Sequence, residues 1–364
     1  MTKFEELGVK RVINGSFCYT VLGSSILAKE IIDASIDANK YFVDMTDLEE
    51  KAGKIISQET RAEAAHITAG AFSALVLSAA ACITGMDLNK MKKLPDTRGM
   101  KNEIIIQKNL RISFDRAMEI PGGKLVVIEP NADALSRAIN EKTAAVHFLP
   151  KLDPLRTDVV PLEDIIEIGH RNNVPIIVDA AGQTYPTERL RTFVEKGADL
   201  VCYSGKYIYG PNSTGFVCGK KNLIDAVIAN SFIGPETGWI GRGYKLDRQE
   251  IIAIVTALKR WMRMDHEKER FQPAYRKRIY LIDALKEIPE ITLTSLPYLY
   301  HSVGLQITFN KLSSEETSKL VDMLRSGNPS IWVKRNENNI IINTLFLLDG
   351  DENVIAGRLR QLFS

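Results

Sequence analysis

The sequence predicts an α/β fold with a large, mostly parallel central sheet, followed by a smaller α+β domain. Short, continuous apolar runs alternate with helical segments between residues 63 and 204, which is typical of parallel strands buried on both faces. After Arg242 the chain changes to long, charged amphipathic helices. Residues 291–363 then alternate strand patterns with two helices, which indicates a small antiparallel sheet covered by helices.

The predicted elements of the large sheet follow one another in a regular order. Residues 25–39 carry apolar side chains at helical spacing and form a helix behind an irregular arm. Residues 63–85 indicate a short strand, a tight turn and a long helix. Further strands are expected at 103–107, 125–129, 144–149, 174–179 and 200–204, and helices at 162–172, 187–196, 248–264 and 267–288.

These patterns divide the chain into three predicted segments. An N-terminal arm and helix occupy residues 1–60, a large ligand-binding domain occupies 61–265, and a small α+β domain occupies 266–364. The last boundary falls inside the helical region near residue 265. No internal repeat or low-complexity tract interrupts this organisation.

Composition and charge narrow the possible partners. The 364 residues include 47 Lys or Arg and 45 Asp or Glu, a net charge of +2, which gives no basic excess for a nucleic acid. Cys18, Cys82, Cys202 and Cys218 are widely spaced and fit neither a disulfide framework nor a zinc site, and no metal cluster is expected. The alanine-rich run 67–85 indicates a buried helix, and the N-terminus lacks a signal-peptide pattern. We expect a cytoplasmic protein without a membrane partner.

A turn rich in small residues opens the long predicted helix. Thr68, Ala69, Gly70 and Ala71 follow a strand, and small residues allow a ligand to approach the backbone closely. A helix N-terminus attracts phosphate through its unpaired N–H groups and its dipole. The same pattern also fits a simple packing turn between strand and helix. The motif of a P-loop is absent.

An aspartate and a lysine each follow a predicted buried strand. Asp179 ends a strand where α/β proteins bind ligands, and it could cap a helix, bind a metal or pair with a protonated ring nitrogen. Lys206 comes two residues after a later strand, where partial burial would make its amine a nucleophile. A lysine that reaches solvent is the alternative. In this order, a phosphate cradle, an acid and a lysine match the needs of pyridoxal phosphate.

The sequence resembles the pyridoxal-phosphate enzymes related to selenocysteine synthase (L-seryl-tRNA selenium transferase), especially shorter members such as D-glucosaminate-6-phosphate ammonia lyase. The resemblance covers residues 8–262, and the last hundred residues match weakly but fit the small domain of fold-type I enzymes. The matching stretches are GVKRVING, YFVDMTDLEEKAG, ITAGAFSALVLSAAACITG, LPDTRGMKNEIIIQK, VPIIVDAAGQ, GADLVCYSGK, GPNSTGFVCGKKNLI and IGRGYKLDRQEI.

This resemblance implies a fold-type I (aspartate-aminotransferase-like) architecture, a homo-oligomer of at least two subunits, and a set of site residues. Lys206 would bind the cofactor as a Schiff base, Asp179 would pair with its ring nitrogen, and Ala181 would pack on the ring. The phosphate would be held by Thr68, Ala69, Gly70, Ala71 and Ser204. Arg242 would meet an anionic substrate group or the partner subunit. Arg111 and His147 are further candidates for substrate binding, and for His147, which lies in an apolar strand, a hydrogen-bonded core residue is the alternative. Arg156 and Asp158 are expected near the site entrance.

Two departures from the family pattern concern the reaction. Leu110 precedes Arg111 where the family often has a histidine stacked over the ring, and a leucine cannot transfer a proton. The loop Ser204-Gly205-Lys206 is also one glycine shorter than the usual Ser-Gly-Gly-Lys. We therefore still expect the protein to bind pyridoxal phosphate, but these two departures do not allow the reaction to be inferred from the family.

The preferred hypothesis is an α,β-elimination on a small amino acid or amino sugar acid, of the ammonia-lyase or dehydratase type. A racemase, or a transferase that replaces a β-group with sulfur or selenium, shares the same first proton abstraction and remains an alternative. A non-catalytic family member is a third hypothesis. The match begins near the first residue and leaves no room for an additional tRNA-binding domain, so a tRNA substrate is not expected.

Overall fold

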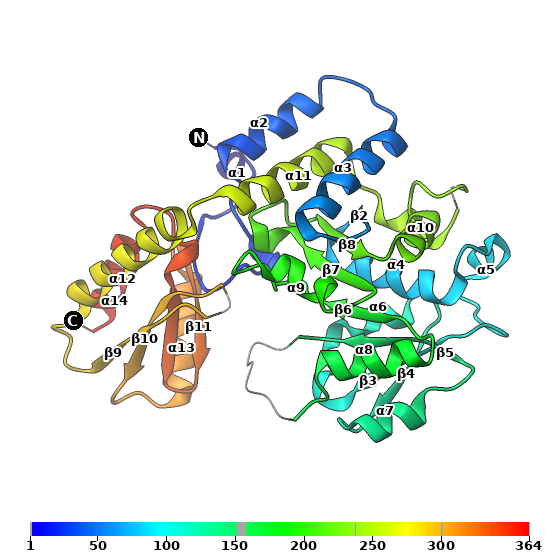
Figure 1. The fold of residues 1–364 in the computed structure, drawn as a ribbon. Coiled ribbons are helices and arrows are strands. Elements are labelled where there is room, and N and C mark those ends of the chain that lie inside the picture. The colour runs from blue at the N-terminus through cyan, green and yellow to red at the C-terminus, as the bar shows by residue number, and fades with distance from the viewer. Residues whose placement is uncertain (1, 151–157, 237, 300, 364) are drawn as a thin grey trace. The chain divides into compact units, whose positions relative to one another are not determined.

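The computed structural model describes residues 2–150, 158–236, 238–299 and 301–363. The chain divides into two compact units. The larger unit is Ile26–Met262, and the smaller unit combines Met1–Ser25 with Arg263–Ser364. Figure 1 shows the elements of both units.

The larger unit is built on a seven-stranded sheet in the order β2-β8-β7-β6-β5-β3-β4. All neighbours are parallel except at β8, which is antiparallel to β2 and to β7. The predicted mostly parallel α/β sheet is therefore confirmed. The strands are β2 (Ala64–Thr68), β3 (Glu103–Gln107), β4 (Lys124–Ile128), β5 (Thr143–Phe148), β6 (Ile176–Asp179), β7 (Leu200–Ser204) and β8 (Gly215–Gly219).

The alanine-rich helix α4 (Gly70–Thr84) packs on one face of this sheet (Figure 1). Its small side chains share a core with Ala145, Ile177, Cys202 and Val217 from four strands. Because α4 is surrounded by protein, it is apolar almost all round, which explains the long apolar run in the sequence. Among the described residues, no helix has both the length and the apolar character needed to cross a membrane.

The other helices of the larger unit surround the sheet. The predicted helices at 162–172, 187–196 and 248–264 are confirmed as α8, α9 and α11, whereas several short elements that carry no strong periodicity were not predicted. The helices are α2 (Lys29–Ala38), α3 (Met45–Thr60), α5 (Leu88–Lys93), α6 (Arg116–Glu119), α7 (Ala132–Ala138), α8 (Leu162–Arg171), α9 (Arg189–Glu195), α10 (Lys221–Asn230) and α11 (Arg248–Arg263, whose last residue lies past the unit boundary).

The outer edge of the sheet, at β2, is closed by a buried side chain. Glu49 of α3 accepts a hydrogen bond from the Ile67 N–H at 3.4 Å and lies 3.3 Å from Nδ1 of His66. Both Glu49 and His66 are at most 2% exposed. This contact satisfies an edge-strand N–H that would otherwise be unpaired.

The smaller unit contains a five-stranded sheet in the order β1-β11-β12-β10-β9. The pairs among β9 to β12 are antiparallel, as predicted, but β1 pairs in parallel with β11. Its elements are β1 (Val12–Gly15), α12 (Gln272–Leu285), β9 (Ile291–Leu296), β10 (Gly304–Phe309), α13 (Ser314–Ser326), β11 (Ser330–Asn336), β12 (Asn339–Asn343) and α14 (Asp351–Leu362).

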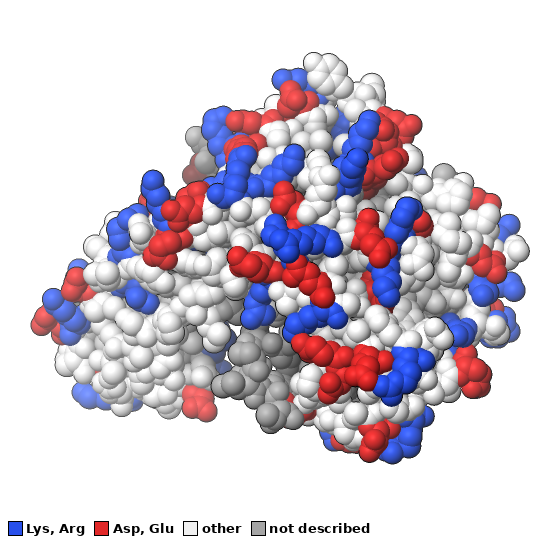
Figure 2. Space-filling model, viewed as in Figure 1, with Lys and Arg blue, Asp and Glu red and all other residues white. Residues whose placement is uncertain are grey.

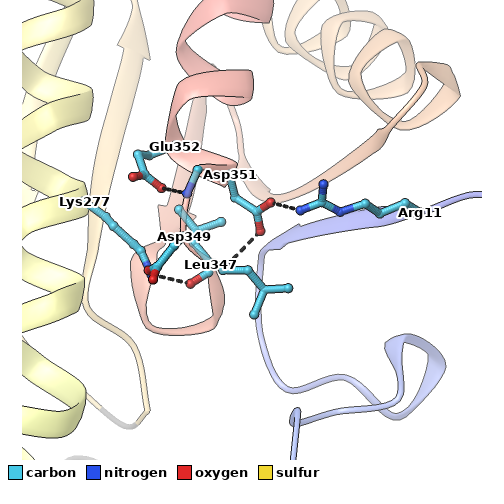
Figure 3. A network of polar contacts seen from close by, with 8 residues as sticks. Arg11, Lys277, Leu347, Asp349, Asp351 and Glu352 are labelled. Atoms are coloured by element: carbon cyan, nitrogen blue, oxygen red, sulfur yellow. Dashed lines mark hydrogen bonds and ion pairs between the residues drawn. The ribbon is translucent and has the colours of Figure 1, made fainter. Parts of the chain in front are cut away.

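The expectation of an irregular N-terminal arm is wrong for β1. Four residues are too few to show a strand period, and their pairing partner is more than 300 residues away. A polar network secures this strand (Figure 3): Arg11 Nη2 lies 2.5 Å from Oδ1 of the buried Asp351, and Lys277 donates to the carbonyl of Leu347 at 2.7 Å. The strand therefore belongs to the core of the smaller unit.

Candidate active site

The sheet register places three predicted site residues at one edge. Thr68 of β2 pairs with Gly215 of β8, and Gly215 pairs with Ser204 of β7. On the next strand, Asp179 pairs with Cys202, two residues before Ser204. Because β2, β7 and β6 run in the same direction, their carboxyl ends meet at this edge, which is where α/β proteins bind ligands.

The turn between β2 and α4 brings backbone N–H groups to the same edge. Gly70 has φ +80°, a conformation that favours glycine, and starts a helix of 15 residues with no side-chain cap. The hydroxyls of Thr68 and Ser73 both donate to the Gly70 carbonyl at 3.0 Å. The first N–H groups of a helix have no partner within it, so those of α4 can bind an anion.

Gly215 makes this close approach of the turn to the sheet possible. A Cβ atom at this position would lie 2.6 Å from the Gly70 carbonyl carbon and 2.8 Å from the Ala71 nitrogen. Both neighbours are backbone atoms and cannot rotate away. A larger residue here would push the start of α4 off the sheet.

Asp179 is a buried carboxylate at the end of β6. It is 6% exposed, and its Oδ1 accepts a hydrogen bond from the Ala181 N–H at 3.2 Å. Burial raises the pKa of Asp179 to about 6, the Ala181 hydrogen bond opposes this, and the charge of Asp115 adds to it. The carbonyl of Ala181 accepts from the Ser204 N–H at 3.1 Å, so these residues form one continuous edge.

Lys206 lies in a 3₁₀ turn, Gly205–Ile208, directly after β7. Its side chain is half-buried, and Nζ lies 5.1 Å from the centroid of the Tyr207 ring. Two backbone hydrogen bonds of 2.8 Å close the loop. The Gly205 N–H donates to the Thr214 carbonyl, and the Gly210 N–H donates to the Gly205 carbonyl. A Cβ at Gly205 would lie 2.3 Å from Thr214 Oγ1, so the one glycine of this shortened loop is tightly enclosed.

A second group of polar residues lies beyond Asp179, near the ends of β3 and β5. Arg111 Nε donates to Oδ2 of the buried Asp115, which also accepts from the Ile112 N–H at 3.0 Å. His147 of β5 is 1% exposed, and burial lowers its pKa to about 4 against the opposing charge of Asp115. Leu110 is buried as well.

Arg242 lies outside this cluster within one chain. It follows Gly241, where an added Cβ would lie 2.3 Å from the carbonyl oxygen of Asn230. The side-chain amide of Asn230 in turn donates a hydrogen bond to Thr84 Oγ1 at 3.0 Å. Thr84 ends α4, and 14 residues at about 1.5 Å each separate it by about 20 Å from Gly70. Arg156 lies outside the described residues.

The residues at this edge fit pyridoxal phosphate. The start of helix α4 offers backbone N–H groups to the phosphate. A side chain at position 215 would occupy the space beside these groups. The buried Asp179 offers a carboxylate for a protonated ring nitrogen, and Lys206 is on the adjacent strand end. In the described part of the chain, no group of three or more His, Cys, Asp or Glu side chains is arranged to hold a metal ion.

Two residues of this region were not predicted from the sequence, Gly215 and Asp115. Gly215 belongs to an antiparallel strand that interrupts the predicted parallel order, and only its contact with Gly70 reveals its role. Asp115 lies in a short turn without a periodic pattern, and its only sequence signal is its spacing of four from Arg111.

Comparison with known proteins agrees with this arrangement. Residues 124–328 match the family described as Aminotransferase class-V. The chain is 32% identical over 266 residues to D-glucosaminate-6-phosphate ammonia lyase of Salmonella typhimurium, which covers 71% of this chain and 69% of that protein. A solved structure of a D-glucosaminate-6-phosphate ammonia-lyase superposes with a TM-score of 0.87 at 26% identity, covering 100% of this chain and 98% of that one.

Two other relatives extend over nearly the whole chain. The 5'-C-glycyluridine monooxygenase-decarboxylase of a Streptomyces species is 28% identical over 378 residues, which cover 99% of this chain and 92% of that protein. The L-seryl-tRNA(Sec) selenium transferase of Aquifex aeolicus is 26% identical over 409 residues, which cover 98% and 85%. The resemblance stated from the sequence motifs is confirmed.

Proposed function

The chain belongs to the class-V aminotransferase family, and from this premise we propose that it is a pyridoxal-phosphate-dependent lyase acting on a small amino sugar acid or amino acid. Pyridoxal phosphate is the cofactor of the enzymes to which it is related. The observation that carries the proposal is the meeting of the α4 N-terminus, Asp179 and the Lys206 turn at one sheet edge.

In this proposal, the start of α4 binds the phosphate. The N–H groups of Gly70 and Ala71 point out of the helix end, and the helix dipole favours a negative charge there. Ser204 adds a hydroxyl from the neighbouring strand end. The hydroxyl of Thr68 already donates to Gly70, so it holds the turn and leaves the phosphate mainly to backbone donors.

Asp179 and Ala181 position the cofactor ring. The Asp179 carboxylate would face the ring nitrogen and keep it protonated, while Ala181 leaves space for a flat ring. The bound cofactor supplies an electron sink for the electron pair left at the substrate α-carbon. The Lys206 amine would hold the cofactor covalently and, once displaced by the substrate amine, would remove the α-proton at Nζ.

In this proposal, arginine side chains bind the anionic groups of the substrate. Arg111 is partly exposed while it binds Asp115, so it can meet a carboxylate or phosphate of the substrate. Arg242 follows Gly241, which contacts the segment near the far end of α4, and Arg242 would serve the site of a partner subunit. Because Leu110 cannot transfer protons, the proton steps fall to Lys206.

A second candidate function is an oxygen-dependent decarboxylation. The sequence alignment to the relative named monooxygenase-decarboxylase covers 99% of this chain, whereas the alignment to the Salmonella ammonia lyase covers 71%. Both reactions begin at the α-carbon of an amine-bearing substrate, so the same Asp179 and Lys206 serve either one. A racemase or a β-replacement transferase also uses this first step.

The test is a product assay on purified protein loaded with pyridoxal phosphate. D-Glucosaminate 6-phosphate, D-glucosaminate, serine and a glycyl nucleoside would each be supplied, with ammonia, carbon dioxide and oxygen measured. Ammonia release without oxygen uptake supports the lyase. Carbon dioxide release with oxygen uptake supports the second candidate, and deuterium exchange at the α-carbon alone supports a racemase. Full turnover by Lys206→Ala would contradict the whole proposal.

We also propose a homo-oligomer in the cytoplasm with no tRNA partner. Exposed apolar side chains gather between residues 26 and 43, an unusual concentration for a monomer: Ile26, Ile32, Ile36, Tyr41, Phe42 and Val43, of which Phe42 is 97% exposed. Basic and acidic residues alternate over the face in Figure 2 without a large basic field. Light scattering on Phe42→Ser tests the interface, since dissociation is expected.

A further inference from the structure

His147 is a buried titratable residue that the proposed function does not use. It is 1% exposed, and neither Nδ1 nor Nε2 has a hydrogen-bond partner. The same is true of Oδ1 of Asp115, which is 2% exposed. Unpaired buried polar atoms are rare in proteins and require a reason.

The sheet register shows what His147 faces. His147 pairs with Ile177 of the neighbouring strand β6, so both side chains lie on the same face of the sheet. Ala145 and Ile177 contact the α4 core, which identifies this face as the one covered by α4. Asp179 follows Ile177 by two residues and therefore shares the face. The strand spacings separate the Cα atoms of His147 and Asp179 by roughly 8 Å.

Asp115 completes a cluster on this face. It precedes α6, which packs on α4, and its charge acts on both His147 and Asp179. The other titratable groups nearby among the described residues are Arg111, which binds Asp115, the buried thiol of Cys202, and Lys206. Helix α4 presents no charged side chain. Two carboxylates therefore share this corner, with a neutral imidazole beside them.

We propose that His147 is a positioning residue that, together with Asp115, controls the ionisation of Asp179 and so the affinity for pyridoxal phosphate. No hydrogen bond joins the two side chains, but a polar imidazole beside Asp179 favours the charged form of a carboxylate that is buried and repelled by Asp115. This inference rests on the proposed function of Asp179 as the partner of the cofactor ring nitrogen. It replaces the expectation that His147 contacts the substrate, because the side chain is enclosed by protein.

The test measures the affinity of the cofactor-free protein for pyridoxal 5'-phosphate between pH 5 and 9. Loss of the imidazole in His147→Leu should move the pH midpoint of binding upward by about one unit, which weakens binding about fivefold at pH 6. His147→Gln retains a polar donor and should stay within about twofold of the wild type. Asp115→Asn removes the repelling charge and should move the midpoint downward. The cofactor's own titration is common to all variants and cancels in the comparison.

A second histidine provides the matched control. His170 pairs with the buried Asp199 at 2.9 Å at the opposite edge of the sheet, so His170→Leu should lower stability without moving the midpoint of cofactor binding. The inference is overturned if His147→Leu binds like the wild type at every pH, or if it and Asp115→Asn move the midpoint in the same direction. A wild-type protein that does not bind the cofactor would overturn the proposed function as well, whereas loss of only the His147 effect leaves that function intact.

Discussion

The burial of Asp179 predicts that this residue of the candidate site lowers the stability of the cofactor-free protein at neutral pH. Burial raises the pKa of Asp179 from the ordinary value of 3.8 to about 6. The folded state therefore favours the protonated carboxyl, and its stabilising contribution is complete below pH 4 and lost as the pH rises through 6. Across this interval the change is about 3 kcal/mol.

Asp179→Asn removes this pH dependence. The amide oxygen of asparagine can still accept the Ala181 N–H, so the local geometry is retained. Relative to the wild type, the cofactor-free variant should gain little at pH 4 and up to about 3 kcal/mol at pH 8. For a unit of this size that corresponds to an increase in Tm of about 6–12 °C. Cofactor affinity and turnover should fall sharply at the same time.

The assay is thermal and urea unfolding of both cofactor-free proteins at pH 4, 6 and 8. Asp133→Asn makes the same change on an exposed helix and should leave the unfolding free energy nearly unchanged. The reasoning is refuted if the Asp179→Asn variant is equally or less stable than the wild type at pH 8, or if the stability difference does not depend on pH.

Three further changes test other parts of the structure. Gly215→Ala forces a methyl group within 2.6 Å of Gly70, so a loss of about 1–3 kcal/mol and weaker cofactor binding are expected in unfolding and titration experiments. Glu49→Ala leaves His66 and an edge N–H unpaired, and urea unfolding should show a loss of about 2 kcal/mol, whereas an unchanged midpoint would contradict the edge role. Arg11→Ala removes the exposed partner of a buried aspartate and should lower the unfolding free energy by about 1 kcal/mol, less at high salt.

The fold was predictable where the sequence carries a strong local pattern. The strands 103–107 and 200–204 and the helix at 70–84 are continuous apolar runs with clear ends, and they appear at those positions. The strand Val12–Gly15 was not predictable, because its stability comes from pairing with a distant strand. The buried face of helix α3 includes the polar residues Glu49, Ser57 and Thr60, and Glu49 accepts a hydrogen bond from the edge strand β2.

The site was predictable only in part. Asp179 ends one buried strand and Lys206 follows another, positions that the sequence alone indicates, and the register brings the two strand ends together. Gly215 and Asp115 were missed because their roles depend on contacts between segments more than 60 residues apart. Arg242 stands in a recognisable motif, yet a motif does not show what its side chain contacts.

The most direct test of the account is to measure whether pyridoxal phosphate attaches covalently to Lys206. The purified protein, Lys206→Ala and the exposed-lysine control Lys221→Ala would be incubated with pyridoxal phosphate, reduced with borohydride and digested for mass spectrometry. The account predicts a visible absorption band that borohydride bleaches and a pyridoxyl group on the peptide containing Lys206, in the wild type and in Lys221→Ala but not in Lys206→Ala. Labelling of another lysine, or a wild-type protein that remains colourless, would contradict it.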